Sequence, residues 1–192
     1  MEFKKIQLNG FKSFADKTDF LFEEGLTGIV GPNGCGKSNI VESLRWCMGE
    51  TSAKSMRGSG MEDVIFSGTS NKPSKNIAEV SIGLSNDNNE GPLQYKNLDE
   101  IQIRRKIEKD KGSKFYINDK EVRAKDAQMF FADLSTGAHS PSLISQGRIG
   151  ALVTAKPVDR RAIIEEAAGI AGLHARRHEA ELRLNASENN LK

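Results

Sequence analysis

The chain has 192 residues, of which 37% are hydrophobic and 28% are charged, and its formal net charge is +2. A chain of this length can bury one sizeable core, or one domain with an appendage, and it has no apolar run approaching the roughly 18 residues that a membrane helix needs. The nearly neutral charge argues neither for nor against nucleic-acid binding, which only local clusters could indicate.

The first 22 residues predict two strands. Ile6 and Leu8 alternate with polar neighbours, which is typical of a half-buried strand, and Phe20 and Phe22 indicate a second strand before a Glu-Glu-Gly turn. The segment between them, residues 11–14, places a lysine and a serine between two phenylalanines. Taken alone, this segment is a strand connection with two core aromatic residues.

A glycine-rich motif that fits the pattern G-x-x-x-x-G-K-[ST] follows. It reads Gly31-Pro32-Asn33-Gly34-Cys35-Gly36-Lys37-Ser38. A buried strand is expected before it, over residues 26–30, and a helix is expected after it, from Lys37 to the residue before Gly49. The apolar positions of this helix are Ile40, Val41, Leu44, Cys47 and Met48.

The order of strand, glycine loop and helix predicts a cradle for nucleotide phosphates. Glycines allow successive backbone N–H groups to turn inward around a phosphate, and the helix N-terminus adds unsatisfied N–H groups and a positive dipole end. Lys37 would then reach the β- and γ-phosphates, and the Ser38 hydroxyl would bind Mg²⁺. The alternative is a glycine-rich turn that matches the motif by chance.

The middle of the chain predicts a basic loop and then an antiparallel meander. Residues 52–60 form a flexible basic stretch that either folds over the phosphate site or is solvated. Residues 78–84 alternate cleanly between apolar and polar side chains, as in a strand with one solvent-facing side. Residues 101–107 and 114–117 continue this pattern after turn-rich loops.

The last third of the chain predicts helices. Residues 123–134 indicate one helix, and Pro157 opens another that runs through Ile170. Further on, apolar or small residues follow the a/d rhythm of a coiled coil, at Ala180, Leu184, Ser187 and Leu191. Fewer than three heptads are present, so a plain amphipathic helix remains the alternative.

The cysteines and the N-terminus point to a reducing compartment. Cys35 lies in the glycine loop and Cys47 on the apolar face of the following helix, which does not suggest a disulfide scaffold. The N-terminus runs directly into alternating residues without the apolar region of a secretory signal. A cytoplasmic location is therefore expected.

Five motifs in order make the chain similar to the N-terminal head segment of the bacterial SMC family (structural maintenance of chromosomes), a family of ABC-type ATPases. They are Gly10-Phe11-Lys12-Ser13-Phe14, residues 31–40, Arg57-Gly58 followed by residues 61–66, Ile144-Ser145-Gln146-Gly147, and residues 160–170. The resemblance implies an α/β P-loop NTPase fold with two parts. Residues 1–156 would form the N-terminal lobe of an ABC-type head with an antiparallel β meander, and residues 157–192 would lead into a coiled coil.

The resemblance also implies roles for single residues. Arg57 is similar to a basic loop residue near the phosphates, and Asp63 would lie near the base or ribose. Gln146 is similar to the Q-loop glutamine, which touches Mg²⁺ and the attacking water, so Lys37 and Gln146 are the expected catalytic residues and Ser38 and Gln146 the metal ligands. The expected nucleotide contacts are Lys12, Ser13, Pro32, Asn33, Gly34, Cys35, Gly36, Lys37, Ser38, Asn39, Arg57 and Asp63. Cys35 departs from the serine of many relatives, which should be tolerated because that position contributes mainly its backbone N–H.

For the whole protein, the resemblance implies a homodimer joined through a hinge and through heads that sandwich ATP. The Walker B, signature and switch-histidine motifs would come from the C-terminal half of the head, so this chain alone should not hydrolyse ATP. Further implied partners are sequence-nonspecific DNA, in a nucleoid-associated setting, and kleisin-type accessory subunits.

Candidate DNA contacts can be named, although a charged surface is the more common explanation for each of them. They are Arg104, Lys106, Lys109, Lys111, Arg176 and Arg177. Three other functions remain open from the sequence: a repair ATPase of the RecN or RecF kind, a small-molecule P-loop kinase, and a coiled-coil arm without turnover.

Overall fold

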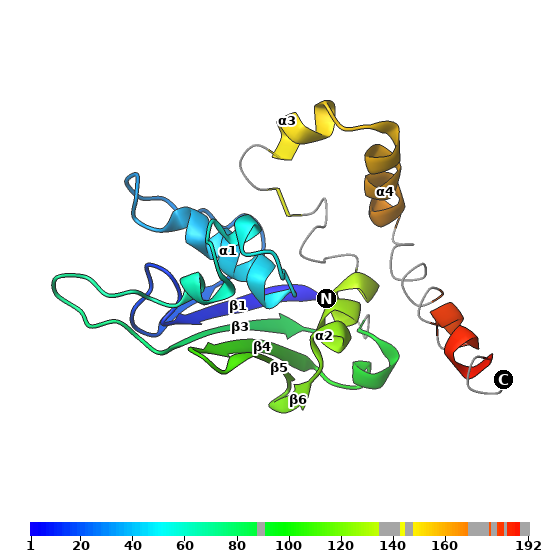
Figure 1. Ribbon diagram of the computed structural model, residues 1–192, viewed down its shortest axis with the longest axis horizontal. Helices are drawn as coiled ribbons and strands as arrows, with labels where there is room; N and C mark the ends of the chain where they lie inside the picture. Colours follow the sequence, from blue (N-terminus) through cyan, green and yellow to red (C-terminus); the bar gives the residue numbers. More distant parts are fainter. Residues whose placement is uncertain are drawn as a thin grey trace. The chain divides into compact units, whose positions relative to one another are not determined.

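The computed structural model describes residues 1–87, 91–134, 143–144, 148–168, 177, 180–182 and 184–188. The chain divides into two compact units, Met1–Gln128 and Met129–Lys192. The first unit holds the sheet and helix α1 (Lys37–Cys47), and the second holds helices α3 (Arg148–Val153) and α4 (Pro157–Ala167) (Figure 1). No helix among the described residues is long and apolar enough to cross a membrane.

A six-stranded antiparallel sheet is the framework of the first unit, with the strand order β2-β1-β3-β4-β5-β6. Its strands are β1 (Glu2–Asn9), β2 (Thr18–Leu21), β3 (Ile77–Ser85), β4 (Glu100–Glu108), β5 (Gly112–Ile117) and β6 (Lys120–Val122). These strands confirm the two predicted near the N-terminus and the predicted meander. They could be predicted because a strand with one buried face alternates between apolar and polar residues. The short edge strand β6 was not predicted.

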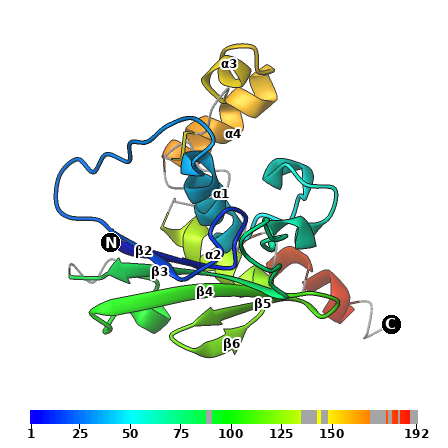
Figure 2. The same cartoon turned by 90° about the vertical axis from the view of Figure 1, so that its left-hand side faces the viewer.

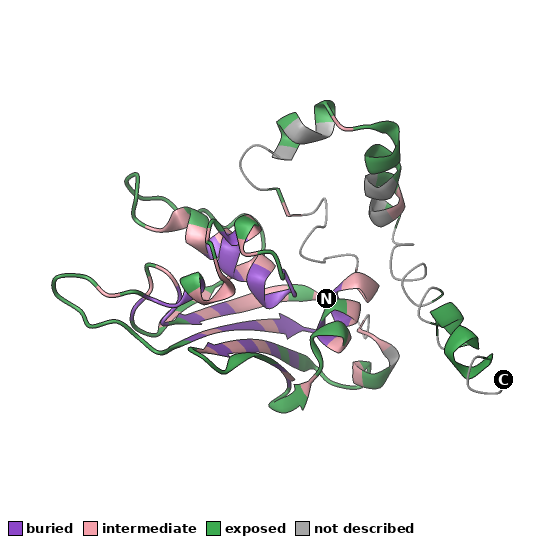
Figure 3. Cartoon of the chain, in the orientation of Figure 1, coloured by how far each residue is buried: buried purple, intermediate pink, exposed green. Residues whose placement is uncertain are grey.

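Helix α1 lies across one face of this sheet (Figures 1 and 2). It begins at Lys37, and Gly49 follows it with a φ of 104°, as the sequence predicts. Trp46 and Cys47 are buried, and the Trp46 ring lies 5.4 Å from that of Phe11. Figure 3 shows the buried residues concentrated in the central strands and on the sheet-facing side of α1.

The buried face of α1 differs in part from the predicted one. Ile40, Ser43 and Trp46 face inward, whereas Val41 and Leu44 are only half-buried. The reason is helical geometry: residues three apart share a face, and Val41 and Leu44 lie on the adjacent face, which the described residues cover only partly.

The predicted strand over residues 26–30 is wrong for this chain. These residues have no regular secondary structure and are exposed, with Leu26 101% and Val30 94% exposed. Figure 2 shows this segment looping away from the sheet before it enters α1. A buried strand needs hydrogen-bonding neighbours and cover on both faces, and none of the described strands pairs with residues 26–30.

Strand β4 carries an inward-facing arginine that the alternation did not predict. Arg105 is 3% exposed and donates hydrogen bonds to the backbone oxygens of Trp46 and Glu50, each at 2.7 Å. Its Nε donates to Ser113 Oγ at 2.7 Å, and its guanidinium stacks 4.5 Å from the Trp46 ring and 4.6 Å from the Phe115 ring. Arg105 thus ties the C-terminal end of α1 to the sheet.

The remaining helices are short. They are the 3₁₀ turns η1 (Lys54–Met56), η2 (Met61–Val64) and η3 (Leu93–Tyr95), and the α-helices α2 (Ala124–Asp133), α3 and α4. Helices α2 and α4 confirm the predictions for residues 123–134 and for the helix that Pro157 opens. Helix α3 was not predicted. Residues 180–182 and 184–188 are helical.

The two cysteines are expected to react very differently. Cys35 is exposed, whereas Cys47 is buried and its Sγ lies 3.5 Å from the Val80 oxygen. Burial raises the pKa of the Cys47 thiol to about 12, so it stays protonated and inert at neutral pH. Ellman's reagent at about pH 8, near the pKa of a free thiol, should label Cys35 alone in the folded chain and both cysteines in denaturant. Labelling of both in the folded chain would mean that α1 does not pack as described.

Candidate nucleotide-phosphate site

The glycine loop of residues 31–36 joins the exposed segment 26–30 to the start of α1. Gly34 and Gly36 have φ values of 83° and 99°, a left-handed conformation that glycine adopts without penalty. Gly36 is the N-cap of α1, and a Cβ placed on it would lie 2.5 Å from Ser13 Oγ. Residues 31–35 are exposed to solvent. The loop is therefore open to a ligand, and at Gly36 it has no room for a side chain.

The side chain of Lys37 folds back into this loop. Its ammonium donates to the backbone oxygens of Gly31 at 2.6 Å and Pro32 at 2.7 Å, and it lies 3.9 Å from Cys35 Sγ. A positive charge is thus held within the curve of the loop, beside the N–H groups at the start of α1. Ser38 is exposed on the first turn of the helix.

Four other predicted site residues come together next to the first turn of α1. Asn39 Nδ2 donates to Ser13 Oγ at 2.9 Å, and Arg57 donates through its terminal nitrogen to Asn39 Oδ1 at 3.0 Å. Lys12 and Arg57 both pair with the carboxylate of Glu42, and Lys12 also donates to the backbone oxygen of Met56. Arg57 therefore anchors the basic loop to α1, while its own side chain stays 60% exposed.

Glu42 is a residue of this site that was not predicted from the sequence. It lies on α1 three residues after Asn39 and four before Trp46, and such residues share a helix face. Its side chain is 11% exposed. The signal that could have found it is this spacing, which places an acidic residue on the same face as a predicted site residue and a core tryptophan. A carboxylate in such a position is buried only when cations accompany it.

Asp63 is placed differently from the other predicted residues. Its carboxylate accepts hydrogen bonds from the backbone N–H groups of Ser59 and Gly60, at 2.6 and 3.0 Å, and from the Ser59 hydroxyl at 2.8 Å. These bonds, that of Gly60 first, lower the pKa of the Asp63 carboxyl below its usual value. Asp63 thus organises the loop that follows Arg57, and a contact with the base or ribose stays a prediction.

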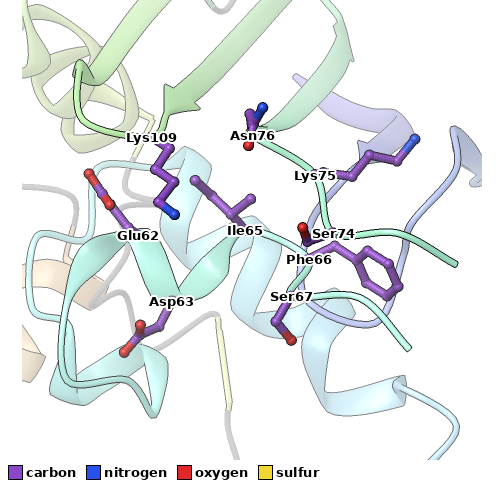
Figure 4. A pocket seen from close by; sticks show the side chains of 9 residues that line it. All are labelled: Glu62, Asp63, Ile65, Phe66, Ser67, Ser74, Lys75, Asn76 and Lys109. Carbon is purple, nitrogen blue, oxygen red and sulfur yellow. The ribbon is translucent and has the colours of Figure 1, made fainter. Parts of the chain in front are cut away.

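Asp63 also borders a cleft of about 540 Å³. Its lining residues are Glu62, Asp63, Ile65, Phe66, Ser67, Ser74, Lys75, Asn76 and Lys109. Figure 4 shows the Asp63 carboxylate directed away from Ile65 and Lys109. Glu62 accepts a hydrogen bond from the Asp110 N–H at 3.0 Å.

The expected catalytic and metal-binding residue Gln146 lies outside the described residues, so its place stays a prediction. Among the described residues, the structure brings Lys12, Ser13, Asn39 and Arg57 together beside the loop that Lys37 occupies. The arrangement combines cations, glycine backbone and a helix N-terminus, which is the chemistry of an anion site.

Comparison with known proteins identifies relatives of this fold and motif. The family model of the RecF/RecN/SMC N terminal domain matches residues 2–147. The chromosome partition protein Smc of Cereibacter sphaeroides is 58% identical over 191 residues, an alignment that covers 100% of this chain and 17% of that protein. The chain therefore spans about a sixth of the length of this relative.

Solved structures are similar as well. An Smc head bound to the C-winged helix domain of ScpA has a TM-score of 0.82 and 33% identity, covering 89% of this chain and 52% of that one. A structure described as the structural biochemistry of ATP-driven dimerization and DNA-stimulated activation of SMC ATPases has a TM-score of 0.74 and 33% identity, covering 87% of this chain and 99% of that one.

These matches confirm the predicted fold class, a P-loop α/β head with an antiparallel meander. The family model extends over β1 to α2 and includes the glycine loop and the basic loop. The chain belongs to the RecF/RecN/SMC N-terminal domain family, and within it to the bacterial SMC proteins, of whose ATPase head it is an N-terminal segment.

Proposed function

We propose that this chain is the ATP-binding N-terminal lobe of a chromosome partition ATPase. One observation carries the proposal: the Lys37 ammonium lies inside a solvent-open glycine loop at the N-terminus of α1. Such a loop favours a polyphosphate, since inward N–H groups and a fixed cation replace the water that phosphates lose. The activity of the whole protein is part of the proposal, because the chain spans 17% of its Smc relative.

ATP would be held by the loop residues 32–39 together with Lys12, Ser13, Arg57 and Asp63. The residues present fit a triphosphate: Gly36 leaves no side chain in the way, and the Arg57 side chain is 60% exposed beside α1. Ser38 and Gln146 would bind Mg²⁺, which neutralises phosphate charge as the γ-phosphoryl group is transferred. Lys37 and Gln146 would be the catalytic residues on this side of the site.

The C-terminal half of the head would complete the lobe. Leu26, Ile29 and Val30 are exposed apolar residues in a segment that pairs with none of the described strands, and a partner strand would cover them. In the similar head bound to ScpA, the match covers 52% of that chain, which leaves room for such a half. That half would also bring the Walker B, signature and switch-histidine motifs, so this chain alone should bind nucleotide without turning it over.

The similar structures suggest further partners. Their descriptions name ATP-driven dimerization, DNA-stimulated activation and ScpA binding, and we infer a hinge-linked head dimer, a kleisin-type subunit and sequence-nonspecific DNA for this protein, in a nucleoid-associated cytoplasmic setting. Each DNA phosphate neutralised would add about 0.9 to the log–log salt slope. Of the basic candidates, Arg104 and Lys111 are already paired with acidic neighbours.

Reconstitution tests the proposal directly. The chain alone should not hydrolyse ATP, whereas adding the separately expressed C-terminal half of the head should produce ATPase activity that DNA stimulates, because the missing motifs then meet the nucleotide. Phosphate release with and without duplex DNA is the measurement. Phosphate transfer to a small acceptor without DNA dependence would instead favour a P-loop kinase, and brisk hydrolysis by the chain alone would reject the proposal.

A further inference from the structure

Glu42 is a buried carboxylate with no role in the predicted site. Its side chain is 11% exposed, and it pairs with Lys12, which is 13% exposed, and with Arg57, which is 60% exposed. A carboxylate at this depth is unfavourable unless cations and hydrogen bonds compensate it. Here the compensation comes from the β1–β2 connection and from the basic loop, so Glu42 joins both to α1.

The Arg57 guanidinium is held through two of its nitrogen atoms. Its Nε pairs with Glu42 Oε1, and its terminal nitrogen donates to Asn39 Oδ1 at 3.0 Å. A guanidinium is planar and carries further N–H donors beyond these bonds. Because the side chain is 60% exposed, those donors are open to a ligand while the orientation of the plane is fixed.

The backbone agrees with this interpretation. Lys12 and Arg57 have φ values of 46° and 55°, in the left-handed region that is unfavourable for residues with a side chain. Such conformations persist where surrounding contacts enforce them, and they cluster at ligand sites. Both cations that pair with Glu42 are therefore held in unfavourable backbone conformations next to the glycine loop.

Arg57 is connected to the glycine loop through Asn39 and Ser13. Asn39, which orients the guanidinium, also donates to Ser13 Oγ, and Ser13 fills the space in front of Gly36. The chain of contacts from Glu42 to the loop thus runs through Arg57, Asn39 and Ser13. A phosphate held by the loop would lie next to a cation whose direction is already set.

We propose that Glu42 is a positioning residue that holds the Arg57 guanidinium toward the phosphates of the bound nucleotide. This inference rests on the proposed ATP site. Glu42 itself does not touch the nucleotide, and it acts by fixing the plane of Arg57, which lowers the ordering cost of each bond that Arg57 forms with a phosphate.

A double-mutant cycle on the full-length protein tests the proposal, with ATP affinity measured by equilibrium binding. Arg57→Ala should weaken ATP binding about tenfold in the wild-type background and less than about twofold in the Glu42→Ala background, since an unoriented Arg57 contributes little. Glu42→Gln serves the same purpose if the alanine variant fails to fold. Glu42→Asp, which keeps the charge, should restore most of the Arg57 effect.

Glu79 provides the control. Its side chain is 26% exposed and pairs with Arg104 on the neighbouring strand β4, so Arg57→Ala should keep its tenfold effect in the Glu79→Ala background. An Arg57 effect of equal size with and without Glu42, or no Arg57 effect in the wild type, would overturn the proposal. If Lys37→Ala abolishes ATP binding while the cycle is additive, only the role of Glu42 fails; if the wild type binds no ATP, the proposed function fails as well.

Discussion

Replacing Lys37 with alanine is expected to weaken ATP binding at least about a hundredfold in the complete head. The Lys37 ammonium lies inside the glycine loop, where it donates to the oxygens of Gly31 and Pro32. Bonds from a charged donor contribute about 1.5–3 kcal/mol each, so losing such bonds to two phosphate groups amounts to roughly a hundredfold or more.

The stability of the chain should hardly change in the same variant. The loop is exposed, and surface substitutions away from buried networks stay within about 0.5 kcal/mol. Loss of ATP binding without loss of the folded state is therefore the expected combination. Calorimetric titration with ATP and urea unfolding together distinguish it from a general folding defect.

Lys114→Ala is the matched control, since it removes the same charge from an exposed pair with Glu121 on the far strands of the sheet. This variant should bind ATP like the wild type. Lys37→Arg should also bind poorly, because a planar guanidinium does not fit where a compact ammonium contacts adjacent carbonyls. Unchanged ATP affinity in Lys37→Ala would reject the nucleotide site.

The sheet and α1 could be predicted because their signals are local. Alternation at Ile6 and Leu8, and at residues 78–84, follows the two-residue period of a strand, and the helix after Gly36 follows its own period. The glycine pattern predicted a start of α1 near Lys37, and the helix begins there. These features need no knowledge of the rest of the molecule.

The failures concern features whose partners lie far away in sequence or outside this chain. An apolar run at residues 26–30 indicates burial but does not say which segment provides it, and no described strand does. Glu42 meets Lys12 across 30 residues, and Arg105 meets Trp46 across 59. Charged residues on an otherwise apolar face look like interruptions in the sequence, although each is where separate elements join.

In the candidate site, too, local patterns could be predicted and contacts between distant segments could not. The loop residues 31–38 could be predicted from their pattern alone, and Lys12, Ser13, Asn39 and Arg57 from the family resemblance. The shared contact of Lys12 and Arg57 with Glu42 could not be predicted, because it depends on how the loops fold over α1. Asp63 shows the limit of the resemblance, as its carboxylate is engaged by its own loop.

Replacing Arg105 with alanine is expected to lower the free energy of unfolding by about 4 kcal/mol. The backbone oxygens of Trp46 and Glu50 would each lose a bond from a charged donor inside the core, and such bonds contribute about 1.5–3 kcal/mol each. The Trp46 oxygen would keep its bond from the Gly49 N–H at 3.1 Å. The stacking of the guanidinium on Trp46 and Phe115 would be lost too, at about 1–2 kcal/mol for a desolvated contact.

An opposing effect keeps the expected loss below the sum of these contributions. Burial lowers the pKa of Arg105 to about 10, which means that the fold disfavours its charge relative to water. Removing the charge relieves that desolvation. Arg105→Met should accordingly lose less than Arg105→Ala, since it keeps an apolar stem between the rings while removing the same hydrogen-bond donors.

Arg104, the neighbouring residue on β4, provides a control for Arg105 because it has the same side chain in a different environment. Arg104 points to the opposite face of β4, is 25% exposed, and pairs with Glu79 and Asp119. Ion pairs near the surface contribute about 1 kcal/mol or less, and the Arg104 guanidinium also lies 4.5 Å from the Tyr116 ring, so urea unfolding should give Arg104→Ala a smaller loss than Arg105→Ala. Equal losses would mean that α1 is held to the sheet by its apolar face alone. In that case Arg105 would be a tolerated buried charge and not the anchor that fixes the far end of the helix carrying Lys37.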